Sequence, residues 1–345
     1  MKPKRDFDKS FQPIHDHTPQ HQEEEVRAFS VEHYVRQLHE TTDKLLADRP
    51  NRGDVKLLSV ALRELRYCFK VFARLRDRRQ VTVFGSARMQ PADPSYQQAV
   101  EFSKRMASAG YMVITGGGEG IMEAGHVGAG KENSIGLNIL LPFEQHPNAV
   151  IRNDPKLMHL RYFFTRKLLF VKECEAVALF PGGFGTLDEG FEVLTLVQTG
   201  KSHLFPIVMI DAPGSDYWHH FLRFTKDVLL ARQLISESDL HLFKVTTSID
   251  EAVAEIVNFY RVYHSMRYVK GDLLLRLQRV ISDATLKTIR AEFTDIIREG
   301  TFELTNAQPE ESEETELADL PRLKFRFDRH KLGRLRELID VVNRD

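Results

Sequence analysis

Short apolar runs alternate with amphipathic runs between residues 81 and 260. Runs rich in β-branched residues predict buried strands, and apolar residues three or four positions apart predict helices. The predicted strands are 81–84, 111–115, 134–141, 176–180, 206–210 and 242–245, and the predicted helices are 95–109, 121–129, 162–174, one ending near 199, 217–231 and 249–260. Strands that alternate with helical crossovers are typical of a parallel sheet. We therefore expect an α/β domain with a doubly wound, Rossmann-like parallel sheet over residues 81–262.

The flanking segments lack this alternation. Residues 1–25 are polar and predict a disordered or loosely attached arm, and residues 26–80 predict a helical extension in two segments. Residues 263–345 predict a second helical extension, with a solvated acidic linker near 308–319 and a basic, amphipathic last stretch. The sequence thus predicts one central domain with helical extensions at both ends.

Composition narrows the classes of partner. Lys and Arg number 48 and Asp and Glu number 49 in 345 residues, so no overall field favours nucleic acid or an anionic membrane. The two cysteines lie far apart in sequence and form no metal or redox motif, which fits a reducing compartment. No apolar signal segment or membrane-length apolar run is present. We expect a cytoplasmic protein without membrane or nucleic-acid partners.

The glycine-rich segment 181–189 follows one predicted strand and precedes a helix. Its three glycines let backbone N–H groups approach a ligand, and the amino end of the helix attracts an anion such as a phosphate. Two further special turns, at Gly85 and Gly116, also follow predicted strands. Because ligands of parallel sheets bind at the carboxyl ends of the strands, we expect the three turns to converge on one crevice.

Charged residues near these turns allow two interpretations. Thr186 and Glu189 match a capping box, so the local pattern leaves a helix cap and a catalytic carboxylate equally open. Arg166 and Lys167 interrupt an otherwise apolar helix, and a buried arginine requires an anionic or polar partner. Ile121 stands where a dinucleotide fingerprint needs its last glycine, so no dinucleotide site is predicted. A phosphate cradle beside a carboxylate indicates chemistry on a phosphorylated small molecule.

Taken together, the motifs resemble those of the LONELY GUY (LOG) family. They are GSAR at 85–88, TGGGEGIMEA at 115–124, FFTRK at 163–167 and PGGFGTLDE at 181–189. The first two and the long flanks resemble the long-chain bacterial branch of that family. Phe163 and Phe164 replace the Met-His of the plant-like branch, and Glu119 replaces a proline or small residue. These departures bear on base preference more than on reaction type.

The resemblance implies a nucleoside 5′-monophosphate phosphoribohydrolase. Such an enzyme hydrolyses the N-glycosidic bond of AMP, GMP, CMP or a cytokinin-type nucleotide to free base and ribose 5-phosphate. The resemblance also implies that the reaction needs no metal or other cofactor. It further implies a homodimer or a higher homo-oligomer. Glu189 and Arg166 would be catalytic. The residues expected to bind substrate are Gly85, Ser86, Arg88, Gly116, Gly117, Gly118, Glu123, Lys167, Gly182, Gly183, Gly185 and Thr186.

Two other functions remain as alternatives, and a regulatory or interaction role of the terminal extensions is compatible with catalysis. A non-catalytic nucleotide or molybdenum-cofactor carrier of the same fold would be expected to lack the charge at Glu189 or Arg166, and both charges are present. Family members are often labelled lysine decarboxylases. No lysine of this chain lies in a recognisable setting for pyridoxal phosphate, so decarboxylation is disfavoured.

Overall fold

The computed structural model describes residues 30–141 and 146–345. The arm predicted at residues 1–25 lies outside the described residues. The two helices predicted between 26 and 80 are confirmed as α1 (Val31–Ala47) and α2 (Arg52–Phe72). Among the described helices, none combines the length and apolar character needed to cross a bilayer.

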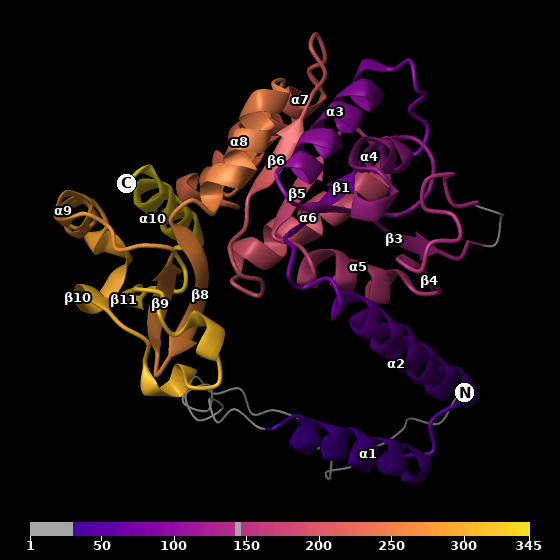
Figure 1. Ribbon diagram of the computed structural model, residues 1–345, viewed down its shortest axis with the longest axis horizontal. Coiled ribbons are helices and arrows are strands. Elements are labelled where there is room, and N and C mark those ends of the chain that lie inside the picture. Colours follow the sequence, from indigo (N-terminus) through magenta and orange to yellow (C-terminus); the bar gives the residue numbers. More distant parts are fainter. Residues whose placement is uncertain (1–29, 142–145) are drawn as a thin grey trace.

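A seven-stranded parallel sheet forms the centre of the protein, in the order β4-β3-β2-β1-β5-β6-β7 (Figure 1). The chain moves outward from β1 to β4 and then returns to the other side of β1 with β5, which confirms the doubly wound topology. The strands are β1 (Gln80–Phe84), β2 (Met112–Thr115), β3 (Ser134–Ile139), β4 (Leu157–Leu160), β5 (Ala176–Leu179), β6 (Ile207–Ile210) and β7 (Lys244–Thr246). The reversal between β1 and β5 defines a switch point, where ligands of such sheets bind.

Helices cover both faces of this sheet. Ala176 and Ala178 of β5 pack in one apolar cluster, whereas Val177 and Leu179 pack in another, as the alternation of a strand requires. The first cluster includes residues of α3 (Pro94–Ser108), α4 (Ile121–Ala129) and α8 (Ile249–Phe259). The second includes residues of α2, α5 (Phe163–Lys172), α6 (Phe184–Gln198) and α7 (Tyr217–Phe224).

Three local features differ from the sequence-based expectation. The edge strand β4 is absent from the predicted strands, because a four-residue strand gives little periodic signal. Helix α6 begins at Phe184, so the glycine segment itself supplies its first turn. The helix predicted over 217–231 consists of α7 followed by a π-helical segment, Thr225–Leu230.

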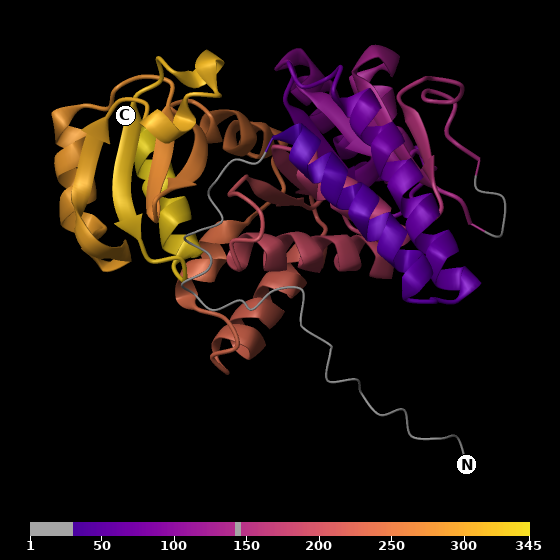
Figure 2. The same cartoon turned by 90° about the horizontal axis from the view of Figure 1, so that it is seen from below.

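The prediction of a helical extension after residue 262 was wrong for most of its length. This region forms a four-stranded antiparallel sheet in the order β10-β11-β9-β8, beside the parallel domain (Figures 1 and 2). Its elements are β8 (Tyr263–Val269), β9 (Asp272–Leu277), α9 (Asp283–Glu292), β10 (Ile297–Thr305), β11 (Arg322–Phe327) and α10 (Leu332–Arg344). Lys270 and Gly271 both have positive φ angles, 49° and 86°, which is typical of the two-residue turn of a hairpin.

The acidic segment near 308–319 is not a solvated linker. Its Glu311 carboxylate is buried and accepts hydrogen bonds from Arg276 Nε, at 2.8 Å, and Arg322 Nε, at 3.2 Å. Arg276 and Arg322 belong to the neighbouring strands β9 and β11. The sequence pattern misled us because the acidic residues pair with arginines that are distant along the chain.

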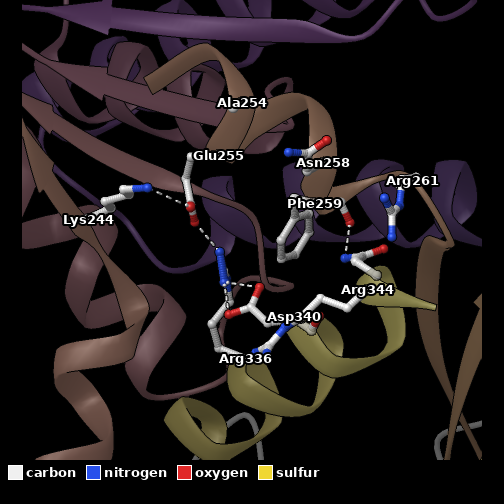
Figure 3. A pocket seen from close by; sticks show the side chains of 10 residues that line it. Lys244, Ala254, Glu255, Asn258, Phe259, Arg261, Arg336, Asp340 and Arg344 are labelled. Atoms are coloured by element: carbon white, nitrogen blue, oxygen red, sulfur yellow. Dashed lines mark hydrogen bonds and ion pairs between the residues drawn. The ribbon is translucent and has the colours of Figure 1, made fainter. Parts of the chain in front are cut away.

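The last helix, α10, joins the two sheets. The Asn343 side chain accepts hydrogen bonds from the Val262 and Tyr263 amides, both at 2.9 Å, and donates to the Phe259 carbonyl at 2.6 Å. Arg336 lies between Glu255 of α8 and Asp340 of α10 (Figure 3). One apolar cluster also runs from Ile114 of the parallel sheet to Phe325 of the antiparallel sheet.

Candidate active site

A cavity of about 820 Å³ lies at the carboxyl ends of β1 and β5, at the switch point of the sheet. Segments from five parts of the chain line it: the turn after β1, the turn after β2 with the start of α4, the end of β3 with the residues just after it, helix α5, and the glycine segment with the start of α6. Its lining residues are Phe84, Gly85, Ser86, Ala87, Arg88, Gly116, Met122, Ile139, Leu141, Phe163, Arg166, Phe170, Gly182, Gly183, Phe184, Gly185, Thr186, Leu187 and Glu189. The predicted convergence of the three glycine turns is thus present.

The turns after β1 and β5 are bound to each other. The Ser86 amide donates to the Pro181 carbonyl at 3.0 Å. A Cβ atom on Gly182 would lie 2.1 Å from Thr186 Oγ1 and 3.0 Å from Ser86 N, so only glycine fits there. The Tyr217 hydroxyl donates to the Gly182 carbonyl at 2.6 Å and holds the segment from the other side. Close packing therefore fixes the backbone at the floor of the cavity.

The amino end of α6 faces the cavity without a cap. Gly183 is the N-cap residue, and no side chain binds the first free amides of the helix. Cβ atoms built on Gly183 or Gly185 would meet nothing within 4 Å, so open space lies beside both residues. Free amides, the positive end of the helix dipole and open space together are suited to a phosphate group.

The capping-box interpretation of Thr186 and Glu189 is wrong. Thr186 lies inside the first turn of α6, and Glu189 lies one turn further on. The Glu189 carboxylate instead accepts a hydrogen bond from Lys167 Nζ at 3.1 Å, and its other oxygen lies 4.0 Å from Arg166 Nη2. Glu189 is therefore free of a capping role and lies between two cations of α5.

Burial and the neighbouring charges shift the pKa values of Glu189, Arg166 and Lys167 in opposite directions. Burial raises the pKa of Glu189, and the neighbouring Lys167 and Arg166 oppose that rise. Burial lowers the pKa of Arg166, which the Glu189 carboxylate opposes. Burial alone would lower the pKa of Lys167, but Asp188, Glu189 and Glu192 raise it on balance. Lys167 therefore stays protonated, with its positive charge beside Glu189.

Arg166 is held by aromatic rings. Its guanidinium carbon lies 4.9 Å from the centre of the Phe163 ring and 5.6 Å from that of Phe170. Its Nε atom is buried and has no hydrogen-bond partner among the described residues. A guanidinium oriented by packing, with donor capacity left over and a buried carboxylate nearby, is suited to bind a polar or anionic ligand.

Most of the predicted site residues meet in the cavity, but four do not line it. Gly117 and Gly118 lie behind it, where their carbonyls accept hydrogen bonds from Asn148 Nδ2 at 3.1 and 2.9 Å. Glu123 lies beside Tyr96 of α3, because the rotation of α4 turns Met122, not Glu123, toward the cavity. Lys167 lies outside the lining and contacts the Glu189 carboxylate.

Sequence reasoning missed the apolar wall of the cavity. Met122, Phe163, Phe170 and Leu187 line it, and nothing in their local pattern distinguishes them from ordinary core residues. Phe163 drew notice only as a departure from the motif of the plant-like branch. An apolar wall opposite a polar floor provides space for a planar organic group beside a phosphate site.

The fold and the site place the chain among Rossmann-like α/β proteins with a glycine-rich anion site at the switch point. A family model described as "Possible lysine decarboxylase" matches residues 118–256. The cytokinin riboside 5′-monophosphate phosphoribohydrolase LOG of Oryza sativa subsp. japonica is 28% identical over 198 residues, 55% of this chain and 77% of that protein. The probable phosphoribohydrolase LOGL5 of the same organism is 31% identical over 153 residues, 42% of this chain and 58% of that protein. The chain is thus similar, over about half of its length, to proteins of the LOG family.

The alignments with two solved structures each span about half of this chain. The structural genomics target TM1055 has a TM-score of 0.36 at 20% identity, and the alignment covers 51% of this chain and 96% of the TM1055 chain. The molybdenum cofactor carrier protein of Chlamydomonas reinhardtii has a TM-score of 0.34 at 19% identity, and the alignment covers 51% of this chain and 94% of the carrier protein's chain.

Proposed function

We propose that this protein hydrolyses the N-glycosidic bond of a nucleoside 5′-monophosphate to the free base and ribose 5-phosphate. The observation that carries the proposal is the meeting of Glu189 and Arg166, 4.0 Å apart, in one cavity with the uncapped amino end of α6. The phosphoribohydrolase names of the relatives in Oryza sativa support the same reaction class.

The phosphate would bind at the start of α6. The amides around Gly183 and Gly185 would donate to its oxygens, and the helix dipole would favour its charge. This arrangement would favour monophosphates over nucleosides, because a nucleoside would leave those amides without a partner. The ribose and base would then extend toward Arg166 and the apolar wall.

Glu189 would act at the ribose. Its carboxylate would bind the ribose hydroxyls and stabilise positive charge on the sugar as the C1′–N bond breaks, or position the attacking water. Water forms the new bond to C1′, and the electron pair of the broken bond leaves with the base, which takes up a proton. Arg166 would stabilise the departing base or a phosphate oxygen, and Lys167 would position Glu189.

We further propose that the protein forms a homodimer or a higher homo-oligomer. Several large apolar side chains of α5 and α6 are exposed next to the cavity: Phe163 is 51%, Phe164 50%, Leu168 47% and Phe184 91% exposed. Such a concentration of apolar side chains is typical of an interaction surface. Light scattering on wild type and Leu168→Glu tests this, with a larger wild-type mass expected and equal masses contradicting this use of the surface.

An incubation without added metal tests the proposed reaction. The purified protein is mixed with a panel of nucleoside 5′-monophosphates and the matching nucleosides, and free base and ribose 5-phosphate are measured by chromatography. We expect base release from monophosphates only. Binding of monophosphates without any release would instead favour a nucleotide carrier of the same fold.

A further inference from the structure

A second cavity, of about 670 Å³, lies at the opposite ends of the same two central strands. Arg79 and Glu175, which directly precede β1 and β5, line it together with Tyr263 to Met266 of β8. In Figure 1, β8 is the strand of the antiparallel sheet nearest to the parallel domain. We call this space the basic cavity. It shares no lining residue with the candidate active site.

Three arginines of the segment between α2 and β1 give the basic cavity its positive charge. Arg76, Arg78 and Arg79 line it, and none of them forms an ion pair with a carboxylate within residues 30–141 and 146–345. The Arg78 guanidinium donates to the Gly110 and Tyr111 carbonyls, at 3.3 and 3.4 Å, and these neutral partners leave its charge uncompensated. Guanidinium groups without carboxylate partners in a concave site favour an anionic ligand.

Arg79 is held in place by a ring. Its guanidinium carbon lies 4.1 Å from the centre of the Tyr260 ring, which is buried. A guanidinium stacked on an aromatic face keeps its N–H edges available, so they can donate to a phosphate in the plane of the group. This pre-orientation lowers the entropy that a ligand must overcome on binding.

Two carboxylates, Asp77 and Glu175, also line the basic cavity. Glu175 Oε2 accepts a hydrogen bond from the Gln80 amide at 2.7 Å, so one oxygen is already engaged by the backbone. Burial raises the pKa of Glu175 to about 7, and the neighbouring Arg79 opposes that rise. The arginines therefore outweigh the carboxylates in this space.

We propose that the basic cavity binds a phosphate-bearing small molecule through Arg76, Arg78 and Arg79. The volume of about 670 Å³ lies within the range of small-molecule sites, roughly 300–1,000 Å³, and exceeds what one phosphate group fills. The site lies at the amino ends of β1 and β5, whereas the proposed substrate binds at their carboxyl ends. A ligand in the basic cavity therefore leaves the candidate active site unoccupied.

Calorimetric titration of the full chain with inorganic pyrophosphate tests this proposal. The double variant Arg76→Gln/Arg79→Gln should weaken one class of sites by about tenfold or more, because charge-assisted hydrogen bonds to phosphate are lost. Arg74→Gln, a matched change of an exposed arginine on the same segment that does not line the cavity, should bind like wild type. Wild-type affinity and stoichiometry in the double variant would overturn the proposal.

A further variant separates this site from the active site. Gly183→Asp places a carboxylate in the open space beside α6 and should remove pyrophosphate binding there while the basic cavity still binds. Complete loss of binding in Gly183→Asp would assign all binding to the active site and refute a second one. If the double variant does not fold, hydrogen exchange of the wild type with and without pyrophosphate tests the proposal. Pyrophosphate should protect amides within 109–111 and 263–266, and unchanged exchange there would refute binding in the basic cavity.

Discussion

The Lys167 ammonium lies 3.1 Å from Glu189 Oε2, and of these two residues only Glu189 lines the candidate active site. Lys167 also contacts Asp188 and Glu192, both at 2.8 Å, so three carboxylates of α6 fix its position on α5. The pair therefore ties the helix that carries Arg166 to the helix that begins at the proposed phosphate site.

Replacing Glu189 tests the proposed catalytic role. Glu189→Gln should lower kcat by about two to three orders of magnitude, because the neutral amide no longer stabilises positive charge on the sugar, and KM should change little. Lys167 keeps Asp188 and Glu192 as partners, so the fold should persist. Steady-state kinetics and circular dichroism give the comparison, and a folded variant with wild-type turnover would remove Glu189 from the mechanism.

Replacing Lys167 should move the pH dependence of the reaction. Lys167 lowers the pKa of Glu189, so its loss in Lys167→Met should raise that pKa. If Glu189 acts as a carboxylate, activity falls as pH drops through its pKa, and the acidic limb of the kcat/KM profile should shift to higher pH. Lys167→Arg should restore the limb. Lys172→Met, on the same helix but paired with Glu173, serves as the control and should leave the limb in place.

Two neighbouring glycines should respond differently to alanine. Gly183→Ala meets no atom within 4 Å, so stability should be unchanged, while KM for a monophosphate should rise by about tenfold as the methyl group occupies space beside the free amides. Gly182→Ala places a methyl group 2.1 Å from Thr186 Oγ1 and should cost about 1–3 kcal/mol of unfolding free energy. Thermal unfolding and kinetics on both variants check this, and equal stability losses would contradict it.

Glu311 should be critical for the antiparallel sheet. Glu311→Ala leaves Arg322 buried without a carboxylate and leaves Arg276 with Glu314 alone, which should cost about 3–5 kcal/mol of unfolding free energy. Glu313→Ala removes an exposed carboxylate of the same segment and should cost less than about 0.5 kcal/mol. Denaturant titration of the two variants measures the difference, and a stable Glu311→Ala would show that the arginines find other partners.

The parallel domain was predictable because its strands are short apolar runs bounded by glycine turns. The antiparallel sheet was not, since the run Leu273-Leu274-Leu275 of β9 has neither the alternation of a half-buried strand nor the period of a helix. The Lys270-Gly271 turn between β8 and β9 was the available signal. Its meaning depends on recognising both flanking strands.

For the candidate site, the sequence indicated the glycine turns but not the partners of each side chain. Thr186 and Glu189 have capping-box spacing, and only the start of α6 at Phe184 excludes that role. The contact between Lys167 and Glu189 joins residues 22 positions apart, and local pattern does not encode it. The direction of Glu123 depends on how α4 is rotated against α3, which tertiary packing decides.

The apolar cluster that runs from Ile114 to Phe325 has a consequence for unfolding. Among the described residues, the two sheets share this one cluster on their facing sides, so loss of one sheet exposes the buried surface of the other. The two sheets therefore form a single cooperative unit, and heat should melt them in one calorimetric transition. A destabilising substitution near residue 325 should then lower the melting temperature of the whole protein, including the distant glycine turns.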